Sequence, residues 1–165
     1  MWSTVLSIGL TVAGIHQDST INPEFAAHLG SIYRHSVPTV TVNELKAMIK
    51  QGAILLDTRE QEEYDVSHMR HARHVGYIWF DMRKVYDIPK ADTIVIYCAI
   101  GNRSERIGEK LQRAGYRHVY NLFGGIYEWV NQRNPVYNRA NIQTTEVHVY
   151  DSSWSRWLQN ASPVE

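Results

Sequence analysis

Short apolar runs that alternate with amphipathic segments constrain the fold of this chain more than any other feature. Residues 54–56 and 93–97 are apolar runs of the length expected for buried strands. Residues 104–114 follow the second run with a helical pattern that stops at Gly115. Strands that alternate with helices imply parallel pairing. The sequence therefore predicts an α/β sandwich of three layers around a central, mostly parallel five-stranded sheet.

The remaining pattern supplies the other elements of this sandwich. We expect five strands, at residues 39–42, 54–56, 72–75, 93–97 and 118–121. We expect helices at residues 44–50, 60–64, 78–85 and 104–114, and a last helix that runs through Trp129. Asn43 is the predicted N-cap of the first of these helices.

The pattern divides the chain into three parts. Residues 1–38 comprise an apolar segment and then a polar linker or packing arm, with a short helix expected at residues 24–29. Residues 39–136 carry the regular alternation and form the predicted domain. Residues 137–165 are expected to be a tail that packs on the domain and includes a strand at residues 146–150. The side chains expected to make that contact are Trp154, Trp157 and Leu158.

The apolar segment at residues 5–15 permits two interpretations. It is too short to span a bilayer as a helix, so no membrane span is expected. Its apolar core and the small residues Val12 and Gly14 are two features of a secretory signal, but no Lys or Arg precedes it. It is either the remnant of an export signal, which favours the periplasm, or a terminal arm of a cytoplasmic protein.

The charge balance argues against binding of nucleic acid. The chain has 17 Lys and Arg against 17 Asp and Glu, so its formal net charge is zero. A basic footprint for nucleic acid is absent, and no nucleic-acid partner is expected. A hydrophobic content of 44% indicates a folded protein. The single cysteine permits no internal disulfide, so cysteine usage does not report the redox compartment.

That cysteine, Cys98, directly follows the strand predicted at residues 93–97. In open parallel sheets the ligand site lies beyond the carboxyl ends of the strands, which is where Cys98 falls. Gly101 permits a tight turn, and Arg103 places a positive charge at the start of the following helix. Loop amides and the positive end of the helix dipole would favour the thiolate, which is the nucleophilic form. Cys98 is therefore the candidate nucleophile.

Other polar residues near strand ends have competing interpretations. Asp57 ends the strand at residues 54–56 and is expected to accept hydrogen bonds from neighbouring loop amides, which is a structural role. His68, His71 and His74 form an H-x-x-H-x-x-H pattern. This spacing does not bring three ligands together on one ion, so no metal site is expected.

Three segments of the chain, in order, resemble the signatures of the rhodanese (sulfurtransferase) family. The first contains Asp57-Thr58-Arg59-Glu60, then Glu63-Tyr64, and then Ser67-His68-Met69. The second resembles the active-site loop and reads Tyr97-Cys98-Ala99-Ile100-Gly101-Asn102-Arg103-Ser104. The third resembles the closing signature, with Gly115-Tyr116, Val119, Leu122, Gly124-Gly125, Trp129 and Pro135-Val136. One such motif is weak, whereas three in register across residues 39–136 are strong.

Three positions depart from the pattern of that family. Ser67 and His71 stand where the family usually has glycine, at positions expected to be turns. Asn134 stands where glycine is usual before the final proline, and asparagine tolerates the left-handed conformation. All three lie outside the thiol loop, so they affect local geometry more than activity.

The resemblance implies a sulfurtransferase. Cys98 would attack the outer sulfur of a donor such as thiosulfate or a persulfide, and the Cys98 persulfide would then pass its sulfur to cyanide or an acceptor thiol. Arg103 would orient an anionic donor or brace the loop by binding carbonyls. The chemistry demands no cofactor. The implied sulfur-binding residues are Ala99, Ile100, Gly101, Asn102, Arg103 and Ser104, and the further candidates for lining the site are Asp57 and Arg59.

Two other functions are alternatives. Related phosphatases place five residues between the cysteine and the arginine, whereas four separate Cys98 from Arg103, and the smaller ring suits sulfur better than a phosphoryl group. A rhodanese-like module would instead bind a protein partner, or sense redox state through oxidation of Cys98, without turnover. The resemblance of the apolar start and aromatic tail to small exported bacterial rhodanese-like proteins favours a periplasmic location.

Overall fold

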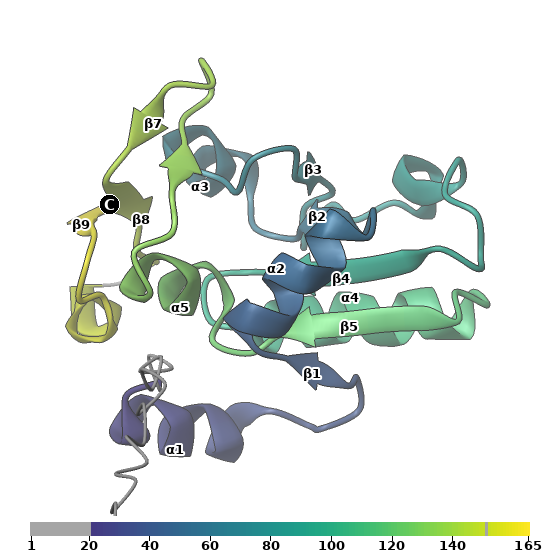
Figure 1. The fold of residues 1–165 in the computed structure, drawn as a ribbon, viewed down its shortest axis with the longest axis horizontal. Helices are drawn as coiled ribbons and strands as arrows, with labels where there is room; N and C mark the ends of the chain where they lie inside the picture. Colours follow the sequence, from purple (N-terminus) through teal and green to yellow (C-terminus); the bar gives the residue numbers. More distant parts are fainter. Residues whose placement is uncertain (1–20, 151) are drawn as a thin grey trace, which may run out of the picture.

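The computed structural model describes residues 21–150 and 152–165. Its centre is a five-stranded sheet in the order β1-β5-β4-β2-β3, in which every neighbouring pair runs parallel (Figure 1). The strands are β1 (Thr39–Val40), β2 (Ile54–Asp57), β3 (Arg73–His74), β4 (Thr93–Tyr97) and β5 (His118–Leu122). The predicted α/β fold with a five-stranded parallel sheet is confirmed.

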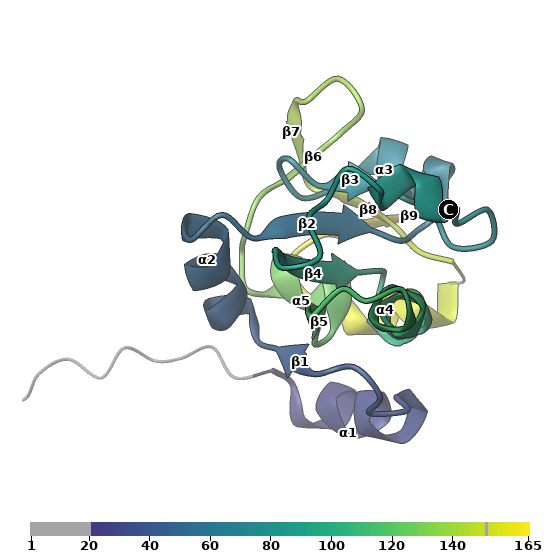
Figure 2. The same cartoon turned by 90° about the vertical axis from the view of Figure 1, so that its right-hand side faces the viewer.

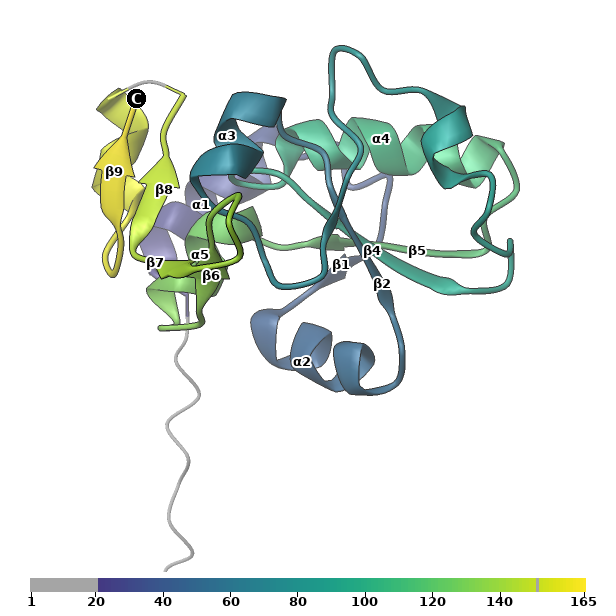
Figure 3. The ribbon, with the colours of Figure 1, turned by 90° about the horizontal axis from the view of Figure 1, so that it is seen from above.

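Alternating residues of the central strands build two cores, one on each face of the sheet. Val95 packs in the core that includes residues of α2 (Val42–Lys50) and α5 (Gly125–Asn131). Its neighbour Ile94 packs in the core that includes residues of α4 (Asn102–Arg113). Because side chains alternate across a strand, one apolar run serves both faces. Figures 2 and 3 show the result, with α2 and α4 on opposite sides of the sheet.

The first helix of the domain begins earlier than predicted, because Thr41 and not Asn43 is its N-cap. The Thr41 hydroxyl accepts the amide of Glu44, and the Glu44 carboxylate accepts the amide of Thr41. This capping box satisfies two backbone donors at once. It also ends β1 at Val40, so the strand is shorter than the predicted residues 39–42.

The helix predicted at residues 78–85 is wrong over its first half. Only Met82–Val85 is helical, as a 3₁₀ turn (η1) that Asp81 caps. Ile78 and Trp79 lie in the preceding loop and are 70% and 81% exposed. Without a core to pack against, apolar side chains do not stabilise a helix.

Two of the three departures from the family pattern do not have the conformation expected of them. His71 adopts the left-handed conformation, with a φ of 62°, as a turn position would. Ser67 is extended, with a φ of −165°, so this position does not require glycine. Near the final proline, the positive φ of 60° belongs to Arg133 and not to Asn134.

The segments outside the sheet pack on one another. The helix α1 (Pro23–Ile32) is longer than the one expected at residues 24–29. Trp157, at the end of the 3₁₀ helix η2 (Ser152–Trp157), stacks on Phe25 of α1 with ring centroids 5.1 Å apart. The other outer elements are α3 (Gln61–Val66), β6 (Val136–Tyr137), β7 (Gln143–Thr144), β8 (Glu146–His148) and β9 (Ser162–Val164). The arm and the tail therefore share an aromatic contact.

The expectation of a strand at residues 146–150 is met only over its first three residues, in β8. The side chains of Trp154, Trp157 and Leu158 are partly buried against the core, as the sequence predicted. Within residues 21–150 and 152–165, no helix is both long and apolar enough to cross a membrane. The apolar segment at residues 5–15 lies outside the described residues, so both interpretations of it stay predictions.

Glu105 of α4 joins the N-terminal arm to this helix. Its buried carboxylate accepts hydrogen bonds from the amides of Arg34 and Ser36, at 2.8 and 2.9 Å. We expect Glu105→Gln to lower the free energy of unfolding by about 1.5–3 kcal/mol, because it removes charge-assisted bonds and turns an amide donor toward a backbone donor. Urea unfolding measures the change.

The matched control is Glu109→Gln, one turn further along α4. The Glu109 carboxylate forms an ion pair of 3.5 Å with the exposed side chain of Arg34. Such a pair contributes less than about 1 kcal/mol. Equal losses in the two variants would contradict the anchoring role of Glu105.

Candidate active site

The candidate nucleophile lies where two structural elements meet. Cys98 directly follows β4, which lies in the sheet between β2 and β5. The chain then turns through residues 99–101 and enters α4 at Asn102. Gly101 makes this turn with a φ of 102°, a conformation that other residues rarely adopt. The N-terminus of a 12-residue helix therefore starts beside the thiol.

The thiol is enclosed by its own loop. Cys98 has no exposed surface. The amide of Gly101 donates to the Cys98 sulfur at 3.0 Å, and the sulfur lies 3.8 Å from the Asn102 side-chain oxygen. The amide of Arg103 donates to that same Asn102 oxygen at 2.8 Å. Among residues 99–103, where we expected several amides to converge on the sulfur, Gly101 supplies the one amide contact that the described residues show.

Tyr33 supports the loop from the arm. Its hydroxyl donates to the carbonyl of Ile100 and accepts the amide of Gly124 at 3.1 Å. Burial raises the pKa of Tyr33, so the hydroxyl stays protonated and can donate. A Cβ at Gly101 would lie 1.8 Å from the Tyr33 oxygen. Glycine is therefore required at position 101 both by its backbone angle and by this contact.

The first turn of α5 fixes the other side of the loop. The amides of Ile126 and Tyr127 donate to the carbonyls of Cys98 and Ala99, at 2.9 and 3.1 Å. Gly125 lies between these backbones with a φ of 57°, and a Cβ there would meet the Cys98 carbonyl oxygen at 2.4 Å. These bonds hold the residue that carries the thiol by its own backbone.

Ser104 points away from the sulfur. Its buried hydroxyl donates to the Asn121 side-chain oxygen at 2.7 Å, and the Asn121 amide group donates to the Gly101 carbonyl at 2.8 Å. This residue therefore ties α4 and the loop to β5.

Arg103 is held in a buried ion pair. Its guanidinium donates two hydrogen bonds of 2.7 Å to the carboxylate of Glu63, a residue of α3 that is 3% exposed. Burial disfavours charge on both groups, but their mutual hydrogen bonds raise the pKa of Arg103 and lower that of Glu63. The sequence leaves two roles open for Arg103, orienting an anionic donor or bracing the loop through backbone carbonyls, and the structure shows its guanidinium bound to a carboxylate.

Asp57 and Arg59 form a second buried pair. Arg59 donates to Asp57 from its side chain and from its own amide, and also to the Ser67 carbonyl at 2.6 Å. Neither residue has exposed surface. The hydrogen bond that Asp57 accepts from the backbone amide of Arg59 is the kind that the predicted structural role of Asp57 requires. Arg59 lies inside the fold, where the electrostatic effect of its charge reaches Glu63, and it is absent from the cavity wall described below.

The three histidines do not converge. His68 stacks on Tyr64 with ring centroids 3.9 Å apart, and His74 Nε2 lies 2.7 Å from the carbonyl of Arg59. His71 is exposed. Across the part of the chain that the structure describes, no group of three His, Cys, Asp or Glu residues is placed to hold a metal ion.

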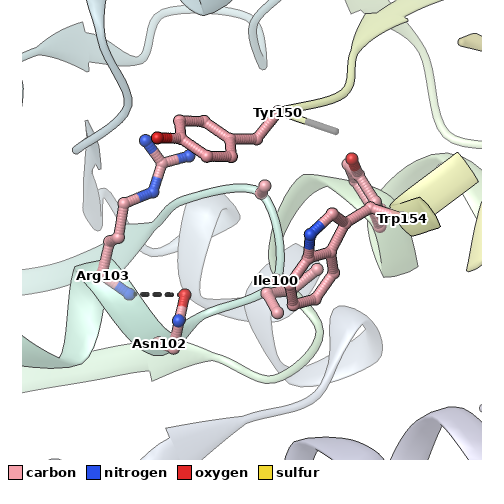
Figure 4. Close-up of a pocket in the computed structure, with 7 residues that line it drawn as sticks. Ile100, Asn102, Arg103, Tyr150 and Trp154 are labelled. Atoms are coloured by element: carbon pink, nitrogen blue, oxygen red, sulfur yellow. Dashed lines mark hydrogen bonds between the residues drawn. The ribbon is translucent and has the colours of Figure 1, made fainter. Parts of the chain in front are cut away.

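A cavity of about 270 Å³ opens beside the thiol loop. Its floor is formed by four loop residues, and its wall by three aromatic side chains (Figure 4). The loop residues are Ala99, Ile100, Asn102 and Arg103, and the aromatic residues are Tyr127, Tyr150 and Trp154. The sulfur of Cys98 lies 3.8 Å from the side-chain oxygen of Asn102, one of these lining residues.

Several residues of this site were not identified from the sequence. Tyr33 lies 67 residues from its partner Ile100, in a segment that the sequence predicts to be a linker or packing arm. Glu63 was noted only as part of a signature, although its spacing from Glu60 matches the capping box that it forms. No local pattern distinguishes Tyr150 from an ordinary surface residue.

Comparison with known proteins identifies related sequences. A family model of the rhodanese-like domain matches residues 41–132. The chain is 28% identical over 104 residues to the thiosulfate sulfurtransferase GlpE of Haemophilus influenzae, covering 61% of this chain and 95% of that protein. It is 32% identical over 120 residues to a tRNA uridine(34) hydroxylase of Hamiltonella defensa, covering 69% of this chain and 31% of that protein. This chain thus spans about a third of the length of the hydroxylase.

Solved structures show the same fold. A protein from Bacillus halodurans aligns with a TM-score of 0.57 at 23% identity, over 71% of this chain and 87% of that chain. The rhodanese-like domain of an Anabaena protein aligns with a TM-score of 0.56 at 24% identity, over 61% and 79%. At such identities the likeness bears on the fold alone.

The backbone contact at Gly125 leads to a stability prediction. We expect Gly125→Ala to lower the free energy of unfolding by about 2–5 kcal/mol, because it combines a left-handed alanine with a clash against the Cys98 carbonyl. The control is Gly30→Ala on α1, where a Cβ meets nothing within 4 Å and alanine should stabilise by about 0.5–1 kcal/mol. Urea unfolding of both variants measures the difference. A neutral Gly125→Ala would contradict the close approach.

The Glu63–Arg103 pair leads to a prediction about pH. The folded pKa of Glu63 lies below its ordinary value of 4.5. Its contribution to stability is therefore complete above that value and is lost as the pH falls through the folded pKa. We expect the urea midpoint of the wild type to fall more steeply below pH 4.5 than that of Glu63→Gln. The exposed Glu62→Gln variant should keep the wild-type slope, and a common slope for all three proteins would exclude this role.

Proposed function

The chain belongs to the rhodanese-like domain family, and on that premise we propose that it is a sulfurtransferase in which Cys98 carries the sulfur as a persulfide. One observation supports this above the others: the Gly101 amide donates to the Cys98 sulfur at 3.0 Å, in a tight loop at the start of α4. A sulfur atom in that position meets a backbone dipole suited to an anion.

The proposed reaction has two half-reactions. The Cys98 thiolate attacks the outer sulfur of thiosulfate, a Cys98 S–S bond forms, and the donor's own S–S bond breaks with its electron pair leaving on sulfite. Cyanide or an acceptor thiolate then attacks the terminal sulfur of the persulfide, and Cys98 leaves as the thiolate. Covalent catalysis of this kind gives ping-pong kinetics and demands no cofactor.

The residues of the loop take separate roles in this proposal. Gly101 supplies the amide, and the N-terminus of α4 favours the anionic persulfide. Asn102 stands next to the sulfur at 3.8 Å, where its side chain meets the terminal atom of the persulfide. Arg103, Asp57 and Arg59 act as positioning residues through their carboxylate pairs. We place the sulfur-transfer domain at residues 39–136.

The loop length supports sulfur over phosphate as the group transferred. Four residues lie between Cys98 and Arg103, and the enclosed ring leaves the thiol without exposed surface. A phosphoryl group carries three further oxygens that would each need a donor inside this ring. The single sulfane sulfur needs only the space of one atom beside Cys98.

Two relatives mark the range of what the family does. The match to the thiosulfate sulfurtransferase GlpE spans nearly all of that protein, which supports transfer from a small sulfur donor. The match to the tRNA uridine(34) hydroxylase spans about a third of it, and we do not extend that activity to this chain. The second candidate is a module that binds a protein partner, or senses redox state, without turnover.

Intact mass measures the first half-reaction. Incubation of the purified protein with thiosulfate should add about 32 Da, one sulfur atom, and cyanide should remove it. Cys98→Ser should gain nothing, because the nucleophile is absent. If the wild-type thiol is free and reactive but gains no sulfur from thiosulfate or from a persulfide, the sulfurtransferase proposal is wrong and the binding module stands instead.

A further inference from the structure

Two of the three residues in the aromatic wall of the cavity lie outside the residues that the family model matches. That match ends at residue 132, whereas Tyr150 and Trp154 lie in the tail. The ring of Tyr150 lines the cavity while being 79% exposed, so it is available to a ligand. In Figure 4 the Tyr150 ring extends toward the Arg103 guanidinium, and the Trp154 indole lies beside Ile100. This chain therefore adds its own surface to the shared loop.

The tail that carries this wall is anchored to the fold. Asn131 at the end of α5 donates to the Trp157 carbonyl at 2.8 Å and accepts the amide of Gln159 at 2.8 Å. On the other side, the His28 ring of α1 contacts the rings of Trp154 and Trp157, with centroids 5.7 and 5.6 Å apart. The indole of Trp154 is thus held in place before any ligand arrives, which lowers the entropy cost of binding.

The charge in the cavity is already neutralised. Arg103 is the one charged residue among the described residues that line it, and its guanidinium donates from Nη1 and Nη2 to the carboxylate of Glu63. A paired arginine attracts a dianion such as thiosulfate far less than a free one. The remaining lining residues are neutral, and most are apolar or aromatic. The cavity therefore favours ligands that bind through apolar and aromatic contact over ligands that bind through their charge.

The buried position of the thiol means that only the outer sulfur of a donor can reach it, while the rest of the donor molecule (its body) stays outside the loop. Cys98 has no exposed surface, and Asn102, 3.8 Å from its sulfur, lines the cavity, so we infer that the outer sulfur of a donor reaches the thiol from the side of Asn102. The rest of the donor stays in the cavity of about 270 Å³, roughly the share of nine water molecules at ~30 Å³ each. This volume lies just below the roughly 300 Å³ at which pockets for drug-sized ligands begin, so the cavity suits a compact ring and not a larger molecule.

We propose that the aromatic wall of Tyr127, Tyr150 and Trp154 binds the body of the sulfur donor and selects an organic donor with a flat apolar ring over a donor without a ring. This inference rests on the proposed function and names its substrate class: organic thiosulfonates and persulfides whose carbon group is a ring. Aromatic faces bind flat rings by stacking and by excluding water. The donor's ring would lie between Tyr150 and the Trp154 indole.

The chemistry with such a donor is balanced. The Cys98 thiolate attacks the sulfane sulfur of a thiosulfonate, R–SO₂–S⁻, and a Cys98 S–S bond forms. The bond between the two donor sulfurs breaks, and its electron pair leaves on the sulfinate, R–SO₂⁻. The persulfide then passes its sulfur to cyanide as thiocyanate, so no external oxidant or reductant is consumed.

Two donors of equal charge test the proposal. Benzenethiosulfonate and methanethiosulfonate present the same reacting group and differ only in the carbon group. We expect kcat/KM with the benzene donor to exceed that with the methane donor by at least about tenfold in the wild type, the scale that apolar pocket contacts supply. Thiocyanate formation measures both rates, and intact mass reports persulfide formation on the same samples.

Substitutions then assign the preference to the wall. Tyr150→Ala removes an exposed ring and leaves the core intact, and Trp154→Ala removes the other tail ring. Each should lower the benzene-to-methane ratio several-fold, and the pair together should abolish most of the preference. Matched controls are Tyr86→Ala and Trp79→Ala, which remove rings that are 68% and 81% exposed and line no part of this cavity. Both controls should keep the wild-type ratio.

The outcomes separate the inference from the function on which it rests. A high ratio that falls in Tyr150→Ala and Trp154→Ala but not in the controls supports the proposal. Turnover of both donors with a ratio that these variants leave unchanged overturns the wall and preserves the sulfurtransferase. Absence of persulfide from thiosulfate and from both thiosulfonates, with a free Cys98 thiol, overturns the proposed function and the inference together.

Discussion

The contact between the backbone at Cys98 and the first turn of α5 is the constraint on which the site depends. The amides of Ile126 and Tyr127 donate to the carbonyls of Cys98 and Ala99, so the end of β4, the loop and α5 form one hydrogen-bonded unit. Backbones approach this closely only where a side chain is absent, which explains Gly125 between them. The position of the thiol is therefore set by backbone geometry. Side chains form the surfaces around the loop, including the cavity beside it.

A site built in this way holds sulfur by dipoles more than by free charge. The arginines at and behind the thiol loop are both paired with carboxylates, Arg103 with Glu63 at the cavity and Arg59 with Asp57 in the interior. Fixed backbone dipoles need no reorganisation when negative charge moves onto the sulfur, so they would favour the proposed persulfide without favouring any particular donor. Discrimination between donors then falls to the surfaces outside the loop.

Local patterns account for the sheet, and long-range contacts account for what the sequence did not reveal. The strand at residues 93–97 and the cysteine at its end follow from an apolar run and from the turn that Gly101 predicts after it. The contact of Tyr33 with the loop joins segments 67 residues apart, and nothing in the arm's own pattern indicates it. The helix predicted at residues 78–85 is wrong over its first half because a local pattern misled the prediction. Ile78 and Trp79 have the apolar character of a buried helix face, but both are exposed to solvent.

Trp154 illustrates why local sequence cannot separate packing from recognition. The sequence indicated that this indole packs the tail on the domain, and its ring does contact His28 of α1 while also lining the cavity. One side chain thus packs on α1 and also lines the cavity in which we propose that the donor binds. A loss of stability on substitution is consequently no argument against a role in specificity. The fraction of folded enzyme cancels when two donors compete for the same preparation, so only the ratio of their kcat/KM values isolates recognition from folding.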